Sequence, residues 1–223
     1  ELFITTIQLN LAERGYKINI GYGLIKKVGD IFNLNRRVLI VTDSGVPKEY
    51  AEEVLRQCLN GEIFTVDQGE GSKSAECFIR LCEKMVHMGM TRSDCVVAVG
   101  GGVVGDLAGF SAASYMRGID FYNVPTTLLS QVDSSIGGKT AINLGGVKNI
   151  VGAFYQPKGV VIDPELLKTL PTRQISNGLA EAIKMSLTSD EDLFDLISRG
   201  DTEKNIEEII IRSLNVKKAV VEE

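Results

Sequence analysis

Residues 94–106 read D-C-V-V-A-V-G-G-G-V-V-G-D, and this stretch decides the fold. Cys95 to Val99 form an uninterrupted apolar run rich in β-branched residues, which predicts a short strand buried in a parallel sheet. Three glycines follow, and the small and apolar residues after them predict a helix. A glycine turn between a strand and a helix presents backbone N–H groups and the positive helix end to an anion. The stretch therefore predicts a nucleotide or phosphate site.

The same glycines fit a dinucleotide-binding spacing only loosely. Gly100, Gly102 and Gly105 match G-x-G-x-x-G, but the regular fingerprint stands in the first strand–helix unit, with an acid about 20 residues later. Here the next acid after Asp106 is Asp120, which opens the next predicted strand. We therefore do not expect the regular fingerprint geometry, and a turn that serves packing alone is the alternative.

Composition narrows the class of protein. A chain of 223 residues with 44% hydrophobic content can bury a core as one large domain or two small ones. The net charge is −5 without a basic block, which argues against a nucleic-acid partner. No signal peptide and no apolar run of membrane-spanning length are recognisable, so we expect a cytoplasmic protein without a membrane contact.

Cysteine usage also indicates a cytoplasmic protein, and histidine usage limits the metal sites that the sequence can form. The four cysteines lack C-x-x-C spacing and lie in apolar, mostly helical settings, which predicts reduced thiols. The one histidine, His87, lies near the end of a predicted helix, where a surface role is favoured over chemistry. A histidine-rich metal site is excluded within this sequence.

Strands and helices alternate on both sides of the central stretch. We expect strands over 3–9, 16–20, 37–41, 63–66, 95–99, 119–124 and 160–162. We expect helices over 24–32 and 46–59, and a long helix that is capped by Ser72 or Ser74 and ends at Met88. This alternation predicts an α/β protein with a doubly wound, mainly parallel, Rossmann-like sheet and ligands at the carboxyl ends of the strands. Asp43, at the end of one such strand, serves either a ribose or the cap of the next helix.

From Thr172 onward the pattern is helical only, over 173–187, 191–198 and 202 to the end. The last helix keeps an apolar stripe and stops without a capping signal, so we expect a truncated chain. We predict an α/β domain over residues 1–171 and the start of a second, all-helical domain over residues 172–223.

A second group of polar residues lies in P-T-T-L-L-S-Q-V-D-S-S-I-G-G-K-T-A-I-N, residues 125–143. Helical spacing places Thr126, Ser130, Asp133 and Gly137 nearly on one helix face. An ordinary core helix does not need an acid such as Asp133.

Two lysines follow glycine pairs. Lys139 comes after Gly-Gly, and Lys148-Asn149 comes after Gly145-Gly146. Lysines presented by glycine turns suit a phosphate, and solvated loop lysines are the alternative. Together with Asp133 and Arg117 they predict a site for a charged small molecule.

These motifs together closely resemble 3-dehydroquinate synthase, a member of the sugar-phosphate cyclase group. The resemblance rests on G-G-G-V-V-G-D, Y-M-R-G, the 125–143 segment, G-V-K-N, L-K-T-L-P-T-R and G-L-A-E-A-I-K-M. It spans roughly residues 37–187, and D-S-S-I-G-G-K-T is its most specific part.

The resemblance implies an enzyme that uses NAD and zinc (or cobalt). It would convert 3-deoxy-arabino-heptulosonate 7-phosphate to 3-dehydroquinate and phosphate in the shikimate pathway. The chemistry would be transient oxidation by NAD, β-elimination and an intramolecular aldol reaction. The enzyme would be a homodimer.

The resemblance also assigns roles to residues. The cofactor contacts would be Asp43, Glu70, Gly71, Ser72, Lys73, Gly101, Gly102, Val103, Val104, Gly105, Asp106, Thr126, Thr127, Lys139, Lys148, Leu166, Leu167, Lys168 and Thr169. The catalytic and substrate-binding residues would be Arg117, Asp133, Lys139, Lys148, Asn149 and Lys184.

Glu181 matches the first zinc ligand of the family, whose other two ligands are histidines that this sequence does not contain. Catalytic zinc needs about three protein ligands, so we expect no ordered zinc and no turnover from this chain alone. Glu181 should point into the cleft beside Asp133 and Lys139; a place at the solvent edge of its helix is the alternative.

Two other functions stay open. One is a non-catalytic, NAD-binding fragment, and the other is a metal-dependent polyol dehydrogenase with the same two-domain plan. The D-S-S-I-G-G-K-T segment argues against the dehydrogenase, because simple hydride transfer needs no pair of phosphate-binding lysines.

Overall fold

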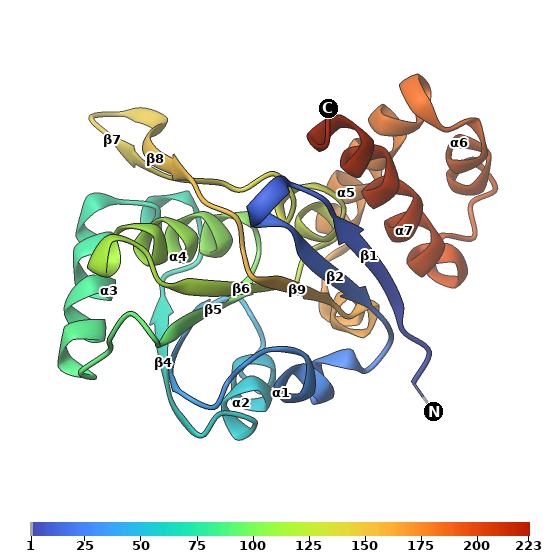
Figure 1. The fold of residues 1–223 in the computed structure, drawn as a ribbon. Coiled ribbons are helices and arrows are strands. Elements are labelled where there is room, and N and C mark those ends of the chain that lie inside the picture. Colours follow the sequence, from blue (N-terminus) through green and yellow to red (C-terminus); the bar gives the residue numbers. More distant parts are fainter. Residues whose placement is uncertain (1) are drawn as a thin grey trace.

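A seven-stranded sheet forms the centre of the computed structural model, which describes residues 2–223 (Figure 1). Its strand order is β1-β2-β9-β6-β5-β3-β4, and every neighbouring pair except β1–β2 is parallel. The strands are β1 (Thr5–Leu9), β2 (Tyr16–Ile20), β3 (Arg37–Asp43), β4 (Asn60–Val66), β5 (Cys95–Gly100), β6 (Asp120–Pro125) and β9 (Gly159–Ile162). The predicted doubly wound, mainly parallel, Rossmann-like fold is confirmed.

Strand β5 is buried over its whole length, as its apolar run predicts. Its alternate side chains enter two different cores. Val97 and Val99 pack with residues of α1 (Val28–Ile31) and α2 (Lys48–Arg56) on one face. Val96 and Ala98 pack with α3 (Ala75–His87) and α4 (Gly102–Ser114) on the other. Both faces of the sheet are therefore covered by helices, as Figure 1 shows.

The chain changes direction across the sheet at the β3–β5 pair. From β3 it continues to β4 on one side, whereas from β5 it continues to β6 on the other side. The helices that follow β3 and β5 consequently lie on opposite faces. In open α/β sheets the crevice at such a reversal is where ligands bind.

The C-terminal helices confirm the predicted helical segment. They are α5 (Thr172–Ser189), α6 (Glu191–Ser198) and α7 (Thr202–Val221), and the 3₁₀ helix η6 (Pro164–Thr169) precedes them. The apolar stripe of α7 packs onto β1, β2 and β9, so this segment shares a core with the sheet. The domain boundary at residue 171 stays a prediction. No helix described over residues 2–223 is both long and apolar enough to cross a membrane.

The structure differs from the sequence pattern in two places. A hairpin of β7 (Lys139–Leu144) and β8 (Val147–Phe154) projects where no strand was predicted; its turn is the Gly145-Gly146 pair, which adopts positive φ. Gly-Gly is a strong hairpin signal, because such turns need positive φ at both central residues.

The predicted polar helix face is also absent. Helical turns begin only at Leu128 and widen into a π-helix, η5 (Ser130–Ser134), so Thr126 precedes the helix and Gly137 follows it. Pro125 ends strand β6, and Gly137 has a φ of 109°, which an α-helix does not accept.

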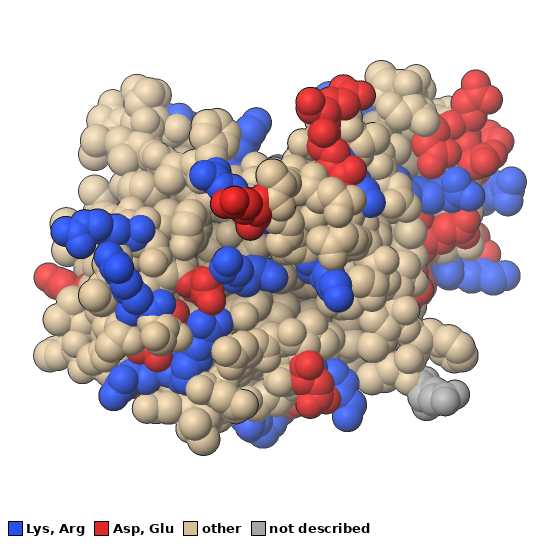
Figure 2. All heavy atoms as spheres, viewed as in Figure 1, with Lys and Arg blue, Asp and Glu red and all other residues tan. Residues whose placement is uncertain are grey.

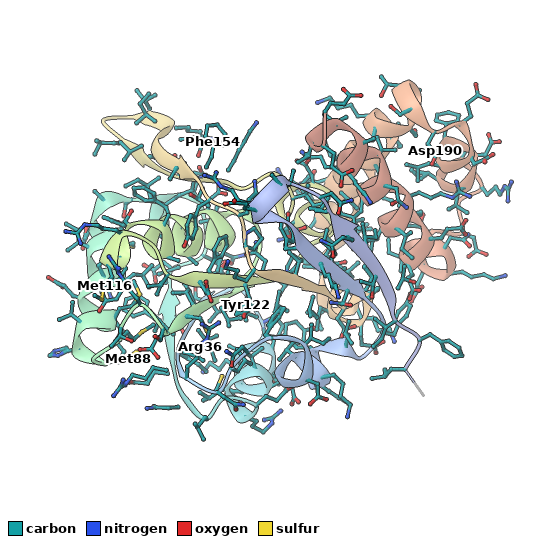
Figure 3. All side chains as sticks on the ribbon, viewed as in Figure 1. Arg36, Met88, Met116, Tyr122, Phe154 and Asp190 are labelled. Atoms are coloured by element: carbon teal, nitrogen blue, oxygen red, sulfur yellow. The ribbon has the colours of Figure 1, made fainter. Side chains whose placement is uncertain are left out.

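Arg36 fastens the amino-terminal edge of the sheet, beside Tyr122 in Figure 3. Its guanidinium donates to Asp120 Oδ2 at 2.9 Å and to the Tyr122 hydroxyl at 3.0 Å. It also donates to the carbonyl oxygens of Ser93 and Asn33 at 3.1 and 2.8 Å. One side chain thus connects the loop before β3 with the starts of β5 and β6.

We predict that Arg36→Met lowers the free energy of unfolding by about 2–3 kcal/mol, because hydrogen bonds to charged groups are worth roughly 1.5–3 kcal/mol each and Asp120 keeps only its 4.0 Å contact with the exposed Lys158. Urea unfolding measures the change. Arg56→Met is the matched control: the Arg56 side chain is 63% exposed against 12% for Arg36. Its surface pair with Glu53 should be worth less than about 1 kcal/mol. Equal losses in the two variants would contradict the prediction.

Candidate functional site

A groove of about 570 Å³ runs across the carboxyl ends of five neighbouring strands. Its volume is typical of a site for a small organic ligand. The lining residues follow β3, β4, β5, β6 and β9 in turn, and they are Asp43, Gly45, Val46, Pro47, Tyr50, Gln68, Gly69, Gly101, Gly102, Val103, Thr126, Thr127, Leu129, Leu166, Thr169, Leu170, Pro171, Gln174 and Asn177.

The glycine turn after β5 forms the floor of the groove. Gly101 is the N-cap of α4 and supplies no side chain to the first turn. The N–H groups at the start of a helix have no acceptor within the helix. The 13 residues of α4 also place the positive end of a helix dipole there. The predicted strand, glycine turn and helix start are confirmed, and they favour an anion above Gly102.

Thr126 and Thr127 stand beside this turn. The Thr126 N–H donates to the Gly100 carbonyl oxygen at 3.0 Å, which ties the end of β6 to the turn. A Cβ at Gly101 would lie 3.2 Å from Thr127 Cγ2, so the backbone of the turn and the threonine are already in close contact. Both threonines line the groove, where the sequence places them.

Asp43 orders the turn before α2 and also reaches the groove. Its Oδ1 accepts from the N–H groups of Gly45 at 2.8 Å and Val46 at 3.1 Å, which orders the turn before α2. The residue is also part of the groove lining. The predicted cap is not formed, because the N-cap residue of α2 is Pro47 and no side chain caps that helix. The ribose role of Asp43 stays a prediction.

The 166–169 segment divides between the groove and the rest of the protein. Leu166 and Thr169 line the groove, and the Tyr50 hydroxyl lies 3.0 Å from Thr169 Oγ1. Leu167 is buried in the core, and Lys168 is exposed and pairs with Glu165 at 2.7 Å. Only the first and last of these four predicted contacts therefore border the groove.

The 70–73 segment lies outside the groove lining, which takes Gln68 and Gly69 instead. Lys73 is 5% exposed and donates to Asp106 Oδ2 at 2.7 Å, and Ser72 Oγ donates to the Asp67 carbonyl oxygen. Burial raises the pKa of Asp106, and the hydrogen bond from Lys73 opposes that rise. The role of these residues as cofactor contacts stays a prediction.

The remaining predicted site residues lie outside the groove, in different places. Val104 is fully buried under the turn, whereas Gly105 and Asp106 border a small polar recess behind it. Lys139 and Asn149 line a neighbouring pocket of about 330 Å³ under the hairpin, together with Asp106. Lys148 is exposed on the hairpin.

Asp133 forms an ion pair with Lys217 of α7. This contact brings the helical segment to η5, one turn before the glycine pair that precedes Lys139. Lys217 was missed from the sequence, because nothing local distinguishes it from its neighbour Lys218 on an amphipathic helix. Only the tertiary packing of α7 marks it as part of the predicted charged site.

Arg117 is not brought to the groove. It follows the C-terminal end of α4, whose first turn borders the groove, and 13 residues of helix span roughly 20 Å. Met116, its neighbour, is labelled in Figure 3 at that far end. Arg117 is exposed and has a φ of 65°.

Glu181 lies on the side of α5 that continues the groove. Gln174 and Asn177 line the groove, and Glu181 and Lys184 follow them at the three- and four-residue spacing of one helix side. Glu181 is half-buried and Lys184 is exposed. Among residues 2–223 no three His, Cys, Asp or Glu side chains gather closely enough to hold a metal ion.

A family model described as 3-dehydroquinate synthase N-terminal matches residues 63–177. The chain belongs to the 3-dehydroquinate synthase family. It is 45% identical over 224 residues to the 3-dehydroquinate synthase of Alkaliphilus metalliredigens, covering 96% of this chain and 63% of that protein. It is also 45% identical over 230 residues to that of Streptococcus thermophilus, covering 97% and 64%. The chain thus spans under two thirds of the length of these family members.

Solved structures agree with the family. A 2-deoxy-scyllo-inosose synthase complexed with carbaglucose-6-phosphate, NAD⁺ and Co²⁺ superposes with a TM-score of 0.89 at 31% identity, covering 98% of this chain and 63% of that one. A 2-epi-5-epi-valiolone synthase from Streptomyces hygroscopicus, with NAD⁺ and Zn²⁺ bound, gives 0.81 at 30%, covering 91% and 60%. A butanol dehydrogenase from Thermotoga maritima gives 0.71 at 19%, covering 93% and 61%, and shares the fold.

We predict that Lys73→Met lowers the free energy of unfolding at neutral pH by about 3 kcal/mol, because breaking a buried ion pair leaves one charge unpaired. A residue that only contacts a ligand would leave stability unchanged. Urea unfolding of Lys73→Met, Asp106→Leu and the double variant measures the coupling. The double variant should recover part of the loss, and additive losses would contradict the prediction.

The loss in Lys73→Met should depend on pH in a set direction. Burial raises the pKa of Asp106 in the folded state, and removing Lys73 leaves that rise unopposed. The folded variant then binds the proton more tightly than the unfolded chain, so its stability falls as pH rises through the raised pKa. Below the unfolded pKa of about 3.9 this contribution vanishes. A loss that shrinks with rising pH would contradict the assignment.

Proposed function

We propose that the groove binds NAD and that the chain supplies the cofactor-binding part of a 3-dehydroquinate synthase. The observation that carries the proposal is the glycine turn and α4 N-terminus at the reversal point of the sheet, in a chain of this family. Backbone N–H groups at Gly102 and Val103 suit a pyrophosphate. The similar cyclase structures hold NAD⁺.

The groove residues fit a dinucleotide by chemistry as well as by size. Asp43 is a carboxylate at the end of a parallel strand, where a ribose hydroxyl is accepted in this class of fold. Thr126 and Thr127 offer hydroxyl groups beside the turn, and Leu166 offers an apolar surface. When bound, NAD supplies a reversible hydride acceptor. The groove holds and orients it.

The substrate class we propose is a sugar-acid phosphate, 3-deoxy-arabino-heptulosonate 7-phosphate, converted to 3-dehydroquinate with release of phosphate. Lys139, Lys148 and Lys184 would be cations for the phosphate and carboxylate, and Asn149 would offer an amide. Asp133 would offer a carboxylate, which pairs with Lys217 in this structure. A cytoplasmic homodimer remains part of the proposal. Arg117 can take part only if another element brings it to the site, since it lies at the far end of α4.

The metal does not fit residues 2–223 by themselves. Glu181 is the one candidate ligand on the groove side of α5, and zinc or cobalt needs about three. A polyol dehydrogenase is a weaker proposal, because its solved relatives are under 20% identical and share the fold alone. The other alternative is a non-catalytic NAD-binding fragment, which would bind NAD in the same groove and convert no substrate.

Calorimetry with NAD and a phosphate-release assay with the sugar phosphate test the proposal on this chain. We expect saturable NAD binding and no sustained phosphate release. Absence of NAD binding would overturn the groove assignment. Sustained release would overturn the metal argument.

Gly102→Asp should raise the Kd for NAD at least about thirtyfold while the protein stays folded. A Cβ at Gly102 meets Ser134 Oγ at an ordinary 3.4 Å, and an acid in the first helical turn favours the helix. The new carboxylate would instead repel the pyrophosphate. The control is Ser198→Asp, which adds the same charge at the end of α6. Unchanged NAD affinity in Gly102→Asp would show that the anion does not bind at this turn.

A further inference from the structure

Strands β6 and β9 separate before they reach the groove. Their ladder contains only the pairs Tyr122↔Gly159 and Asn123↔Val160. Both strands continue beyond it, to Pro125 and Ile162. The next residues on each side, Thr126 and Leu166 among them, form facing parts of the groove lining.

The side-chain amide of Gln131 fills this gap. Its Nε2 donates to the Pro125 carbonyl oxygen at 3.1 Å and to the Asp163 carbonyl oxygen at 3.2 Å. Each strand end thus receives one of the two amide protons. Gln131 belongs to the π-helix η5 and is fully buried. The amide takes the place of the ladder hydrogen bonds that stop two residues earlier.

The Gln131 bridge leaves one buried polar atom without a hydrogen-bond partner. Gln131 Oε1 is buried and has no hydrogen-bond partner. A buried acceptor without a partner costs about 1–3 kcal/mol, which an apolar side chain of the same length would avoid. The gain that offsets it is geometric, because two donors on one rigid amide fix the distance between the two strand ends.

Both ends of the bridge are themselves held. On the β6 side, the Thr126 N–H donates to the Gly100 carbonyl oxygen in the glycine turn. On the β9 side, the buried carboxylate of Asp163 accepts from the N–H groups of Gly23, Ile25 and Glu165 at 2.9–3.1 Å. A movement of Gln131 would therefore shift the floor and one wall of the groove relative to each other.

We propose that Gln131 is a positioning residue that sets the width of the nucleotide groove by holding the ends of β6 and β9 at a fixed separation. The inference rests on the proposed function, because it concerns NAD in this groove. Gln131 does not line the groove and acts through Thr126 and Leu166.

The test compares Gln131→Met with Gln57→Met in this chain. Gln57 is the matched control: its Nε2 also donates to two carbonyl oxygens, of Ile25 at 2.9 Å and Glu53 at 3.0 Å, at the end of α2 away from the groove. Calorimetry gives the Kd for NAD, and thermal unfolding gives the stability. We expect Gln131→Met to weaken NAD binding at least about tenfold with a small change in melting temperature. Gln57→Met should lower the melting temperature and leave the Kd within about twofold.

A second measurement uses the unsubstituted chain and does not depend on a variant that folds. Hydrogen exchange with and without saturating NAD reports on peptides 124–131 and 162–169. If the amide links the two strand ends, NAD should slow exchange in both peptides together. Protection of one peptide alone, or an unchanged Kd in a folded Gln131→Met, would overturn the inference while the proposed function stands. Absence of NAD binding by the unsubstituted chain would overturn both.

Discussion

The groove exists because the connections that leave β3 and β5 go to opposite faces of the sheet. Helix α2 follows β3 on one face, while α4 follows β5 on the other, so no helix covers the space above these two strand ends. The glycine turns after β4 and β5 border this space together with residues of neighbouring helices, and turns with small residues let a ligand approach the backbone. The glycines after β5 and the acid after β3 owe their position to this constraint.

Buried polar groups, rather than apolar contacts, fix the rim of that space. Asp163 is fully buried and collects three N–H groups, and the Lys73–Asp106 pair joins the segment after β4 to α4. Apolar packing is not directional, whereas hydrogen bonds and ion pairs specify one arrangement. A groove floor assembled from five separate strand ends needs that specificity. Figure 2 shows charged side chains of both signs spread over one face of the molecule.

The sequence predicts well what local pattern controls. The apolar run at Cys95–Val99, the alternation of strands and helices, and the range Glu191–Ser198 all appear as expected. The prediction fails where tertiary context decides. Thr140 to Leu144 alternate too weakly to announce a strand, and the π-turn at Ser130–Ser134 depends on packing against the sheet.

The same division holds for the candidate site. Asp43 and the glycine turn at Gly101 and Gly102 were found from the pattern, because parallel strands bring their carboxyl ends to one edge. Thr126 and Thr127 were assigned through the family resemblance. The partner of Asp133 was not, since Lys217 is 84 residues away in the chain and only the packing of α7 brings it near. Gln131 was likewise hidden, because its neighbours in sequence are not its hydrogen-bond partners. Such contacts carry no local signal.

The helical segment meets the groove through one close approach. A Cβ at Gly178 of α5 would lie 2.4 Å from Leu128 Cγ, so only glycine permits the observed spacing between α5 and the helical turn that precedes η5. Glu181 lies less than one turn further along α5, and Gln174 and Asn177 of the same helix line the groove. The distance from Glu181 to the glycine turn therefore depends on the absence of a side chain at Gly178. A bulkier residue there would move this part of α5 outward and carry the Glu181 carboxylate away from the glycine turn. The sheet thus fixes where the groove lies, and this helix contact fixes how near Glu181 comes to it.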